Sequence, residues 1–173
     1  MHLICGWILI AFSSFHVLQS AVYDATIDEF HQEPGTDHDY VILDTVRVTR
    51  KSRNHYQLHG SFRLMQNWGN DIVVHYEIVN QRNVKVVNGK AFVCDLNGSD
   101  DPITLSVHKT AHFPPHGECP MPKGNYSLNG YELTDESLPP MVPPGKFVLS
   151  IRVESPEGKH IVAYKVYSTI KYV

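Results

Sequence analysis

Apolar and polar residues alternate with a period of two along most of this chain. In segment 56–64, Tyr56, Leu58, Phe62 and Leu64 share one register, and polar residues occupy the other. Successive side chains of a strand point to opposite faces, so this alternation predicts strands with one buried face. The same alternation predicts strands at 72–78, 147–153 and 162–172. Two further strands, with apolar residues in both registers, are predicted at 41–48 and 86–94.

Turn-forming residues separate these segments at 67–70, 80–83 and 155–158. Many short strands at this spacing predict an all-β fold, an immunoglobulin-like antiparallel β-sandwich. The pattern leaves room for at most one short helix, over 102–112. Asp100 or Asp101 is its expected N-cap, Pro102 its first residue, and two prolines follow it.

The N-terminal segment has the pattern of a secretory signal peptide. The first twenty residues contain no Asp, Glu, Lys or Arg, and an apolar run from Leu3 to Phe12 precedes a small-residue site near Ser20–Ala21. A membrane anchor is the alternative, but the run is too short to span about 30 Å of hydrocarbon. We therefore expect residues 1–20 to be removed and the protein to be secreted. Residues 21–173 have the length of one domain.

The net charge and the cysteine count limit the possible partners and disulfides of the mature protein. The formal net charge is −3, and no basic patch suggests a nucleic-acid partner. Cys5 leaves with the signal peptide, so Cys94 and Cys119 remain. In an oxidising compartment they have one intramolecular pairing available, and free buried thiols or an intermolecular bridge are the alternatives.

Two sequons permit N-glycosylation at Asn97 and Asn125 in the secretory route. Asn97 begins a polar Asn-Gly-Ser-Asp-Asp loop, which predicts that it is the better acceptor. Asn125 lies inside a turn-strand motif, where it is expected to be less accessible.

The histidines suggest no catalytic or metal site. His108, His112 and His116 are spaced four apart and could share a helix face for zinc, but Pro114 and Pro115 interrupt the helix before His116. The chain has no His-Glu-x-x-His motif, no Gly-x-Ser-x-Gly elbow and no Gly-rich phosphate loop. We therefore expect no catalytic residues, no metal and no cofactor, and predict that the protein is not an enzyme.

Apolar positions on the predicted strands give the candidate ligand-binding residues. Those expected to face the space between the sheets are Phe62, Val74, Tyr76, Phe92, Leu149, Ile151, Tyr164 and Val166. From the pattern alone they either fill a core or line a cavity. Segment 137–145 contains four prolines, and its apolar Leu138, Met141 and Val142 have no strand to bury them. Such a loop suggests a rim that touches a membrane or covers a ligand, and a loop folded onto the core is the alternative.

The run 119–128 reads Cys-Pro-Met-Pro-Lys-Gly-Asn-Tyr-Ser-Leu and resembles a segment of the ganglioside activator, a small secreted glycolipid carrier. It therefore resembles the ML lipid-recognition superfamily, and in particular its insect secreted and chemosensory members. Further matching positions, over about residues 92–173, are Phe92, Cys94, Asp95, Leu96, Leu138, Pro139, Gly145, Phe147, Gly158, Lys159, Lys165 and Lys171.

The resemblance implies a Cys94–Cys119 disulfide and a lipid cup between the sheets, with the 137–145 loop at its mouth. The chain lacks the activator's other three disulfides, one of which would fall near Ala163. The expected function is a secreted carrier of a lipid, fatty acyl or hydrocarbon ligand. The alternatives are a chemosensory protein that presents a hydrophobic cue and a ligand-free interaction sandwich. The expected partners are a hydrophobic molecule and a membrane surface or receptor, and the protein is expected to be a monomer.

Overall fold

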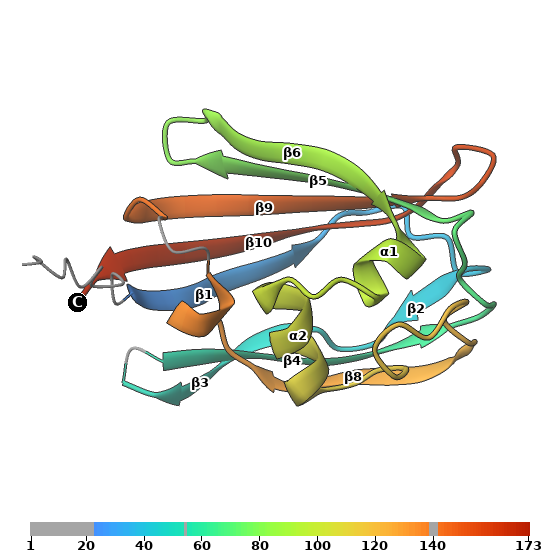
Figure 1. Cartoon of the computed structure of the whole chain (residues 1–173), viewed down its shortest axis with the longest axis horizontal. Helices are drawn as coiled ribbons and strands as arrows, with labels where there is room; N and C mark the ends of the chain where they lie inside the picture. Colours follow the sequence, from blue (N-terminus) through green and yellow to red (C-terminus); the bar gives the residue numbers. More distant parts are fainter. Residues whose placement is uncertain (1–22, 54, 139–141) are drawn as a thin grey trace, which may run out of the picture.

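The computed structural model describes residues 23–53, 55–138 and 142–173. They form two antiparallel sheets that face each other (Figure 1). Sheet A has the strand order β1 (Tyr23–Gln32), β10 (His160–Tyr172), β9 (Gly145–Glu154), β5 (Val73–Asn80) and β6 (Lys85–Phe92). Sheet B has the order β2 (Val41–Leu43), β4 (His55–Leu64), β8 (Gly124–Tyr131) and β7 (Ala111–His112), and β3 (Arg47–Ser52) also pairs with β4. The predicted all-β sandwich is confirmed. The predicted signal peptide and Met141 lie outside the described residues.

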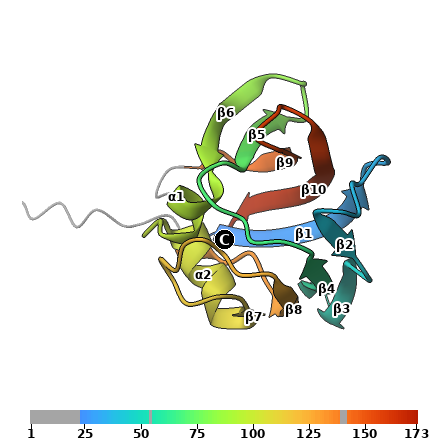
Figure 2. The ribbon, with the colours of Figure 1, turned by 90° about the vertical axis from the view of Figure 1, so that its right-hand side faces the viewer.

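The two helices close one side of the sandwich, between β6 of sheet A and β7 of sheet B (Figure 2). Helix α2 (Pro102–Thr110) is the predicted helix, and its N-cap is Asp101, whose carboxylate accepts from the Thr104 N–H at 3.0 Å. Helix α1 (Val93–Asn97) was not predicted, and a short 3₁₀ helix, η1 (Asp135–Ser137), follows β8.

The predicted strand at 41–48 is two strands, β2 and β3. The chain between them passes so close to β4 that a Cβ placed on Gly60 would lie 2.7 Å from the Cα of Val46. A side chain at Gly60 would therefore collide with the crossing backbone. Gly60 shares the register of the apolar residues of β4, and its missing side chain allows this close approach of the two chains.

Strand pairing in sheet A sets which side chains share the face toward sheet B. Successive rows across β6, β5, β9 and β10 are Val87–Ile78–Leu149–Val166, Gly89–Tyr76–Ile151–Tyr164 and Ala91–Val74–Val153–Val162. Val74, Val153 and Val162 pack in one buried cluster with Leu64 and Tyr126 of sheet B. This face is therefore the inner one. It carries six of the eight predicted inward-facing residues, and Phe62 packs on the same cluster from β4.

Phe92 is the exception, and its predicted inward orientation is wrong. It pairs with Val73, which pairs with Glu154 on the other side, so all three lie on the outer face of sheet A. Its side chain is 44% exposed, whereas the next residue, Val93, is buried at the start of α1. The strand becomes a helix at this point, so the alternation that placed Phe92 inward does not continue through Cys94.

The buried residues form three clusters. The largest joins both sheets and α1, and its most buried members include Leu64, Ile72 and Ile161. A second cluster, Tyr23, Phe147 and Ile170, lies where β1 and β9 begin and β10 ends, and Leu138 and Val142 pack against it. A third, Ile27, Leu58 and Tyr131, joins β1 to sheet B.

Candidate ligand-binding site

The inner face of sheet A is incompletely covered over its middle rows. Leu149 sits midway along β9, the central strand of the sheet, and faces inward, yet it is not buried. Among the described residues it lies outside all three buried clusters. Val87, in the same row, is 45% exposed. A central inward-facing leucine is normally buried, so its exposure indicates accessible space beneath this part of the sheet.

Tyr164 lies in the next row of the same face. Burial raises the pKa of its phenol to about 12. Tyr164 also keeps part of its accessible surface, and it is among the residues that line a groove on the outer face of sheet A. The evidence for accessible space between the sheets therefore comes from Leu149 and Val87. We name the residues around this space the inner apolar surface: Tyr76, Ile78, Val87, Leu149, Ile151, Tyr164 and Val166.

The arrangement of the sheets explains why this surface is accessible. Strand β1 lies against β3 and β4 of sheet B, so the sheets approach closely along one side. Figure 2 shows sheet A curving away from sheet B toward β5 and β6. Sheet B therefore lies closer to β1 than to the β5–β6 half of sheet A.

The structure divides the predicted ligand-binding residues into two groups. Tyr76, Leu149, Ile151, Tyr164 and Val166 lie on the inner apolar surface. The other two inward-facing residues belong to the packed core. Phe62 stacks at ring-centroid distances of 5.6 Å against Phe113 and Tyr126, and Val74 is buried beside it in the largest cluster.

Ile78 and Val87 also lie on this surface, although the predicted set omitted them. Ile78 is in the same register as Val74 and Tyr76 and could have been included on that ground. The inward direction of Val87 conflicts with the one expected for Phe92. The pairing of β6 with β5 is regular from Phe92 to Val87, so Val87 shares a face with Gly89 and Ala91 and lies opposite to Phe92.

The described ends of the predicted entrance loop are folded against the sandwich. Leu138 and Val142 pack on the cluster of Tyr23, Phe147 and Ile170, which Ile78 also contacts. The Val142 N–H donates to the Tyr23 hydroxyl at 2.9 Å, and the Tyr172 hydroxyl donates to the Val142 carbonyl at 3.3 Å. These contacts match the alternative of a loop folded onto the core. Because Ile78 belongs to both groups, the loop adjoins the inner apolar surface.

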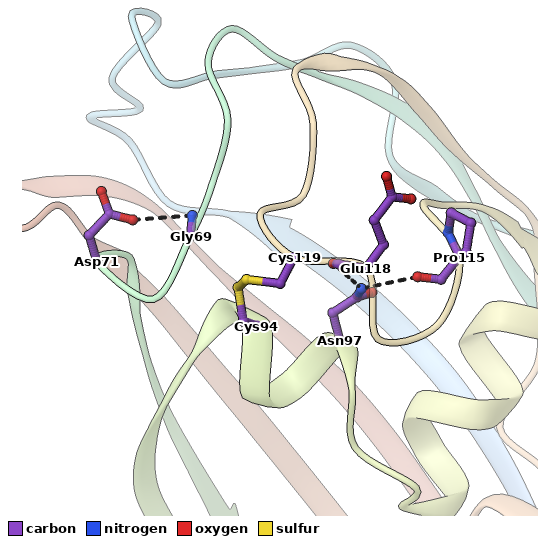
Figure 3. Close-up of a disulfide and its surroundings, with 7 residues drawn as sticks. All are labelled: Gly69, Asp71, Cys94, Asn97, Pro115, Glu118 and Cys119. Atoms are coloured by element: carbon purple, nitrogen blue, oxygen red, sulfur yellow. Dashed lines mark hydrogen bonds between the residues drawn. A yellow bond between two sulfur atoms is a disulfide. The ribbon is translucent and has the colours of Figure 1, made fainter.

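A disulfide joins Cys94 of α1 to Cys119, with their Cα atoms 5.5 Å apart (Figure 3). The predicted pairing is therefore present. Two residues after Cys119, the backbone N–H of Met121 donates to the Trp68 carbonyl at 2.8 Å. The backbone N–H of Trp68 donates to the Met121 carbonyl at 2.9 Å. The bridge thus fixes α1 to the segment that leads into β8.

Asn97, one turn after Cys94, is buried, with only 6% of its surface exposed. Its amide nitrogen donates to the Glu118 carbonyl at 2.9 Å and the Pro115 carbonyl at 3.3 Å (Figure 3). That nitrogen is the atom to which an N-glycan would be attached. The expectation that Asn97 lies in an accessible loop is therefore wrong for the folded chain, because contacts with residues 115–118 bury it. Asn125 is exposed on β8.

We expect secreted protein from eukaryotic cells to carry a glycan at Asn125 and not at Asn97. The test removes each sequon without touching its asparagine, through Ser127→Ala and Ser99→Ala. Treatment with an N-glycosidase should shift the mass of the wild type and of Ser99→Ala, and leave Ser127→Ala unchanged. A glycan retained by Ser127→Ala and lost from Ser99→Ala would contradict this assignment.

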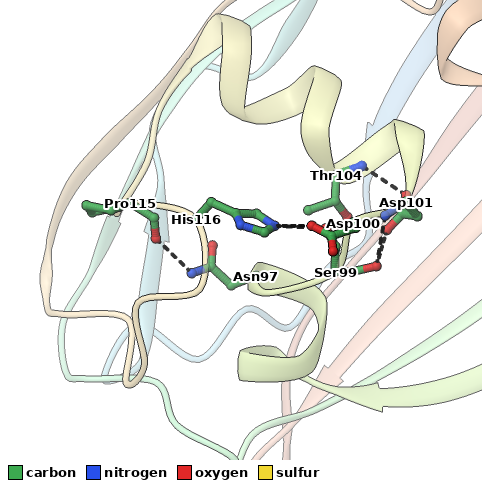
Figure 4. Close-up of polar contacts among 7 residues, drawn as sticks. All are labelled: Asn97, Ser99, Asp100, Asp101, Thr104, Pro115 and His116. Atoms are coloured by element: carbon green, nitrogen blue, oxygen red, sulfur yellow. Dashed lines mark hydrogen bonds and ion pairs between the residues drawn. The ribbon is translucent and has the colours of Figure 1, made fainter.

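His116 lies beside the segment from Asn97 to Asp101 (Figure 4). The His116 ring is 3.0 Å from the Ser99 carbonyl and 3.7 Å from the Asp100 carboxylate. Its centroid is 5.5 Å from that of His108, whose pKa is lowered by burial and by the charge of His116. His112 is exposed on β7. Residues 23–53, 55–138 and 142–173 contain no group of three or more His, Cys, Asp or Glu side chains arranged to hold a metal ion.

An open groove of about 680 Å³ crosses the outer face of sheet A. Its charged lining residues are Glu33, His75, Glu77, Lys85, Lys90, Arg152 and Lys165. Several are already paired: Lys165 lies 2.9 Å from Glu33, and His75 lies 2.9 Å from Glu154 at its margin. Charged side chains on an open surface are better solvated by water than by an apolar ligand. The inner apolar surface is therefore the better candidate for an apolar ligand.

Residues 79–149 match a family described as "Protein of unknown function (DUF1091)", a domain known in ML-like proteins. The match runs from the end of β5 to Leu149 and includes both cysteines. No curated protein matches the chain. Within the described residues, no helix is long and apolar enough to cross a membrane.

Proposed function

We propose that this protein is a secreted, non-enzymatic binding protein that holds a hydrophobic ligand on the inner apolar surface. The observation that carries the proposal is the accessibility of Leu149 at the centre of sheet A. Tyr164 lies in the adjoining row of the same inner face. Both side chains would gain contacts if an apolar molecule lay between the sheets.

Hydrophobic burial is sufficient to drive such binding. An acyl chain gains about 0.8 kcal/mol for each methylene that leaves water, so ten methylenes contribute about 8 kcal/mol before the costs of association. This mechanism requires no charged side chain at the site. It requires an apolar surface of adequate length, which the Val87–Ile78–Leu149–Val166 row and the adjoining Tyr76–Ile151–Tyr164 row supply.

The matched domain and the sequence resemblance support the same reading. A ganglioside-activator-like carrier would lift a lipid from a membrane for another protein, and an insect chemosensory member would present a hydrophobic cue to a receptor. Both uses rest on one binding mechanism, and the tissue of expression distinguishes them.

A ligand-free extracellular interaction protein is the second candidate, favoured by the edge strand β6. Its neighbourhood exposes Val84, Val86 and Val87, at 55%, 48% and 45%. An exposed apolar edge can pair with another chain. Lys85 and Lys90 interrupt this edge, as charged residues do on protected edges.

A lipid-transfer assay with a space-filling variant tests the proposal. Leu149→Trp fills part of the accessible space on the inner apolar surface. We expect uptake of a fluorescent lipid from neutral vesicles to fall by at least about tenfold. This corresponds to a loss of about 1.4 kcal/mol of binding free energy, because the indole would exclude part of the ligand from the surface. Val148→Trp is the matched control, since Val148 is the preceding residue on the outer face of the same strand.

Transfer by Val148→Trp should remain near that of the wild type, and circular dichroism should show both variants folded. If the wild type takes up no lipid from a broad panel, the carrier function is wrong and the interaction protein is favoured. Equal uptake by the wild type and Leu149→Trp would place any ligand somewhere other than the inner apolar surface.

A further inference from the structure

We infer that the inner apolar surface selects electrically neutral lipids that carry an uncharged oxygen function, such as an alcohol or ester, and that the Tyr164 hydroxyl recognises this oxygen. The inference rests on the proposed function, because it names the ligand class of the same site. It assigns Tyr164 as a specificity-determining residue and predicts discrimination against ionised fatty acids.

The first argument is the distribution of charge across sheet A. No described inward-facing residue of β5, β6, β9 or β10 is charged: these positions are Val74, Tyr76, Ile78, Asn80, Val87, Gly89, Ala91, Phe147, Leu149, Ile151, Val153, Val162, Tyr164, Val166, Ser168, Ile170 and Tyr172. The charged residues of these strands lie on the outer face, many of them in ion pairs. Glu154, for example, contacts both His75 and Arg152.

A ligand carboxylate would therefore find no cation on this surface. Moving an ionised group from water to an apolar site without a partner is strongly unfavourable. A methyl ester of the same chain length has the same apolar tail and pays no such cost. The inner surface should thus bind the ester in preference to the acid, although hydrophobic burial drives both.

The second argument is the state of the Tyr164 hydroxyl. A tyrosine phenol is protonated at physiological pH and can donate a hydrogen bond. The neighbours of Tyr164 are Phe30 of β1, with ring centroids 5.4 Å away, Ile151 of β9, and Gln32 of β1, whose amide donates to Thr36. No hydrogen bond to the Tyr164 hydroxyl is formed by the described residues. A hydroxyl without a protein partner gains one if a ligand oxygen lies beside it.

Tyr76 occupies the same row two strands away, and its ring lies across Gly89. A Cβ on Gly89 would be 2.5 Å from the Tyr76 hydroxyl, so only glycine leaves room for this ring position. The row therefore presents two phenols separated by Ile151. Hydroxyl groups in an otherwise apolar row are the chemistry expected for a ligand that is apolar along its length and weakly polar at one point.

The test measures displacement of a fluorescent hydrocarbon probe by methyl dodecanoate and by dodecanoate at pH 7.4. For the wild type, we expect the ester to bind at least about tenfold more tightly than the acid, owing to the desolvation of the carboxylate. Tyr164→Phe should weaken ester binding on the order of fivefold, the effect of one lost hydrogen bond. Its affinity for the probe, which has no oxygen, should be unchanged.

Tyr167→Phe is the matched control, because Tyr167 lies on the outer face of the same strand and contacts His31. It should leave both affinities unchanged. Equal binding of acid and ester by the wild type would overturn the neutral preference while leaving the carrier function intact. An unchanged ester affinity in Tyr164→Phe would overturn the role of Tyr164. Failure of the wild type to bind the probe itself would overturn the carrier function, and this inference with it.

Discussion

Replacing Ile72 with Ala is expected to lower the free energy of unfolding by about 2–5 kcal/mol, whereas Leu149→Ala should lower it by less than about 1.5 kcal/mol. Both changes remove large aliphatic side chains from an all-β core. Ile72 is 1% exposed and belongs to the largest buried cluster, so its truncation leaves a cavity. Leu149 already borders accessible space, so its truncation enlarges that space and creates no new enclosed cavity.

Chemical denaturation of the wild type and the two variants measures this difference. The free energies of unfolding are compared after fitting all three curves with one m-value, the slope of the unfolding free energy against denaturant concentration. Val148→Ala serves as a control for changes on the same strand that leave the inner face untouched. A loss of about 3 kcal/mol or more for Leu149→Ala would mean that Leu149 is packed core. The space between the sheets would then be filled, and no ligand would fit there.

The second large effect is expected from the disulfide. Replacing both Cys94 and Cys119 with Ala should lower the free energy of unfolding by about 3–4 kcal/mol in the chain-entropy account, because the bridge closes a loop with a sequence separation of 25. The two hydrogen bonds from Asn97 and the backbone pairing of Trp68 with Met121 should keep the folded arrangement in place. The variant is therefore expected to fold to the same structure with a lower stability.

Reversible denaturation of the double variant gives the magnitude, and its near-ultraviolet circular dichroism tests whether the fold is retained. Comparison with Cys94→Ala alone is not a suitable control, because it leaves a free thiol. The wild type with reduced and alkylated cysteines provides the matched state. A stability loss below about 1 kcal/mol would contradict a structural role for the bridge.

Most strands of sheet A could be predicted from the sequence, because a strand with one buried face shows that face as an alternation of apolar and polar residues. Leu149, Ile151, Tyr164 and Val166 alternate cleanly with outer residues, and the pairing of β9 with β10 preserves that register. The N-cap Asp101 could be predicted for a similar reason, since a cap depends only on one side chain and on the backbone N–H three residues later.

The features that the sequence missed depend on irregular pairing or on distant contacts. β1 shifts register between Ile27 and Glu29, so its alternation is broken before Phe30 returns to the inner face. A similar shift in β6 leaves Val86 as an extra residue between Lys85 and Val87. Counting by twos cannot locate such bulges, because they follow from how two strands meet.

Phe92 and Asn97 were misassigned for a related reason. Phe92 ends a strand that continues into α1. It pairs with Val73, which pairs with Glu154, so these three residues share the outer face of sheet A. Asn97 belongs to a polar run that looks like an exposed loop, but residues 115–118 supply two carbonyls that bury its amide. Neither partner lies near the residue in sequence.

A crystal structure of the secreted protein with a neutral long-chain ester, such as methyl dodecanoate, tests the central claim most directly. The account predicts electron density for an extended chain between the sheets, in contact with Ile78, Leu149 and Val166, with its oxygen beside the Tyr164 hydroxyl. A structure grown under saturating ester that shows no such density, with Leu149 packed against side chains of sheet B, would contradict it.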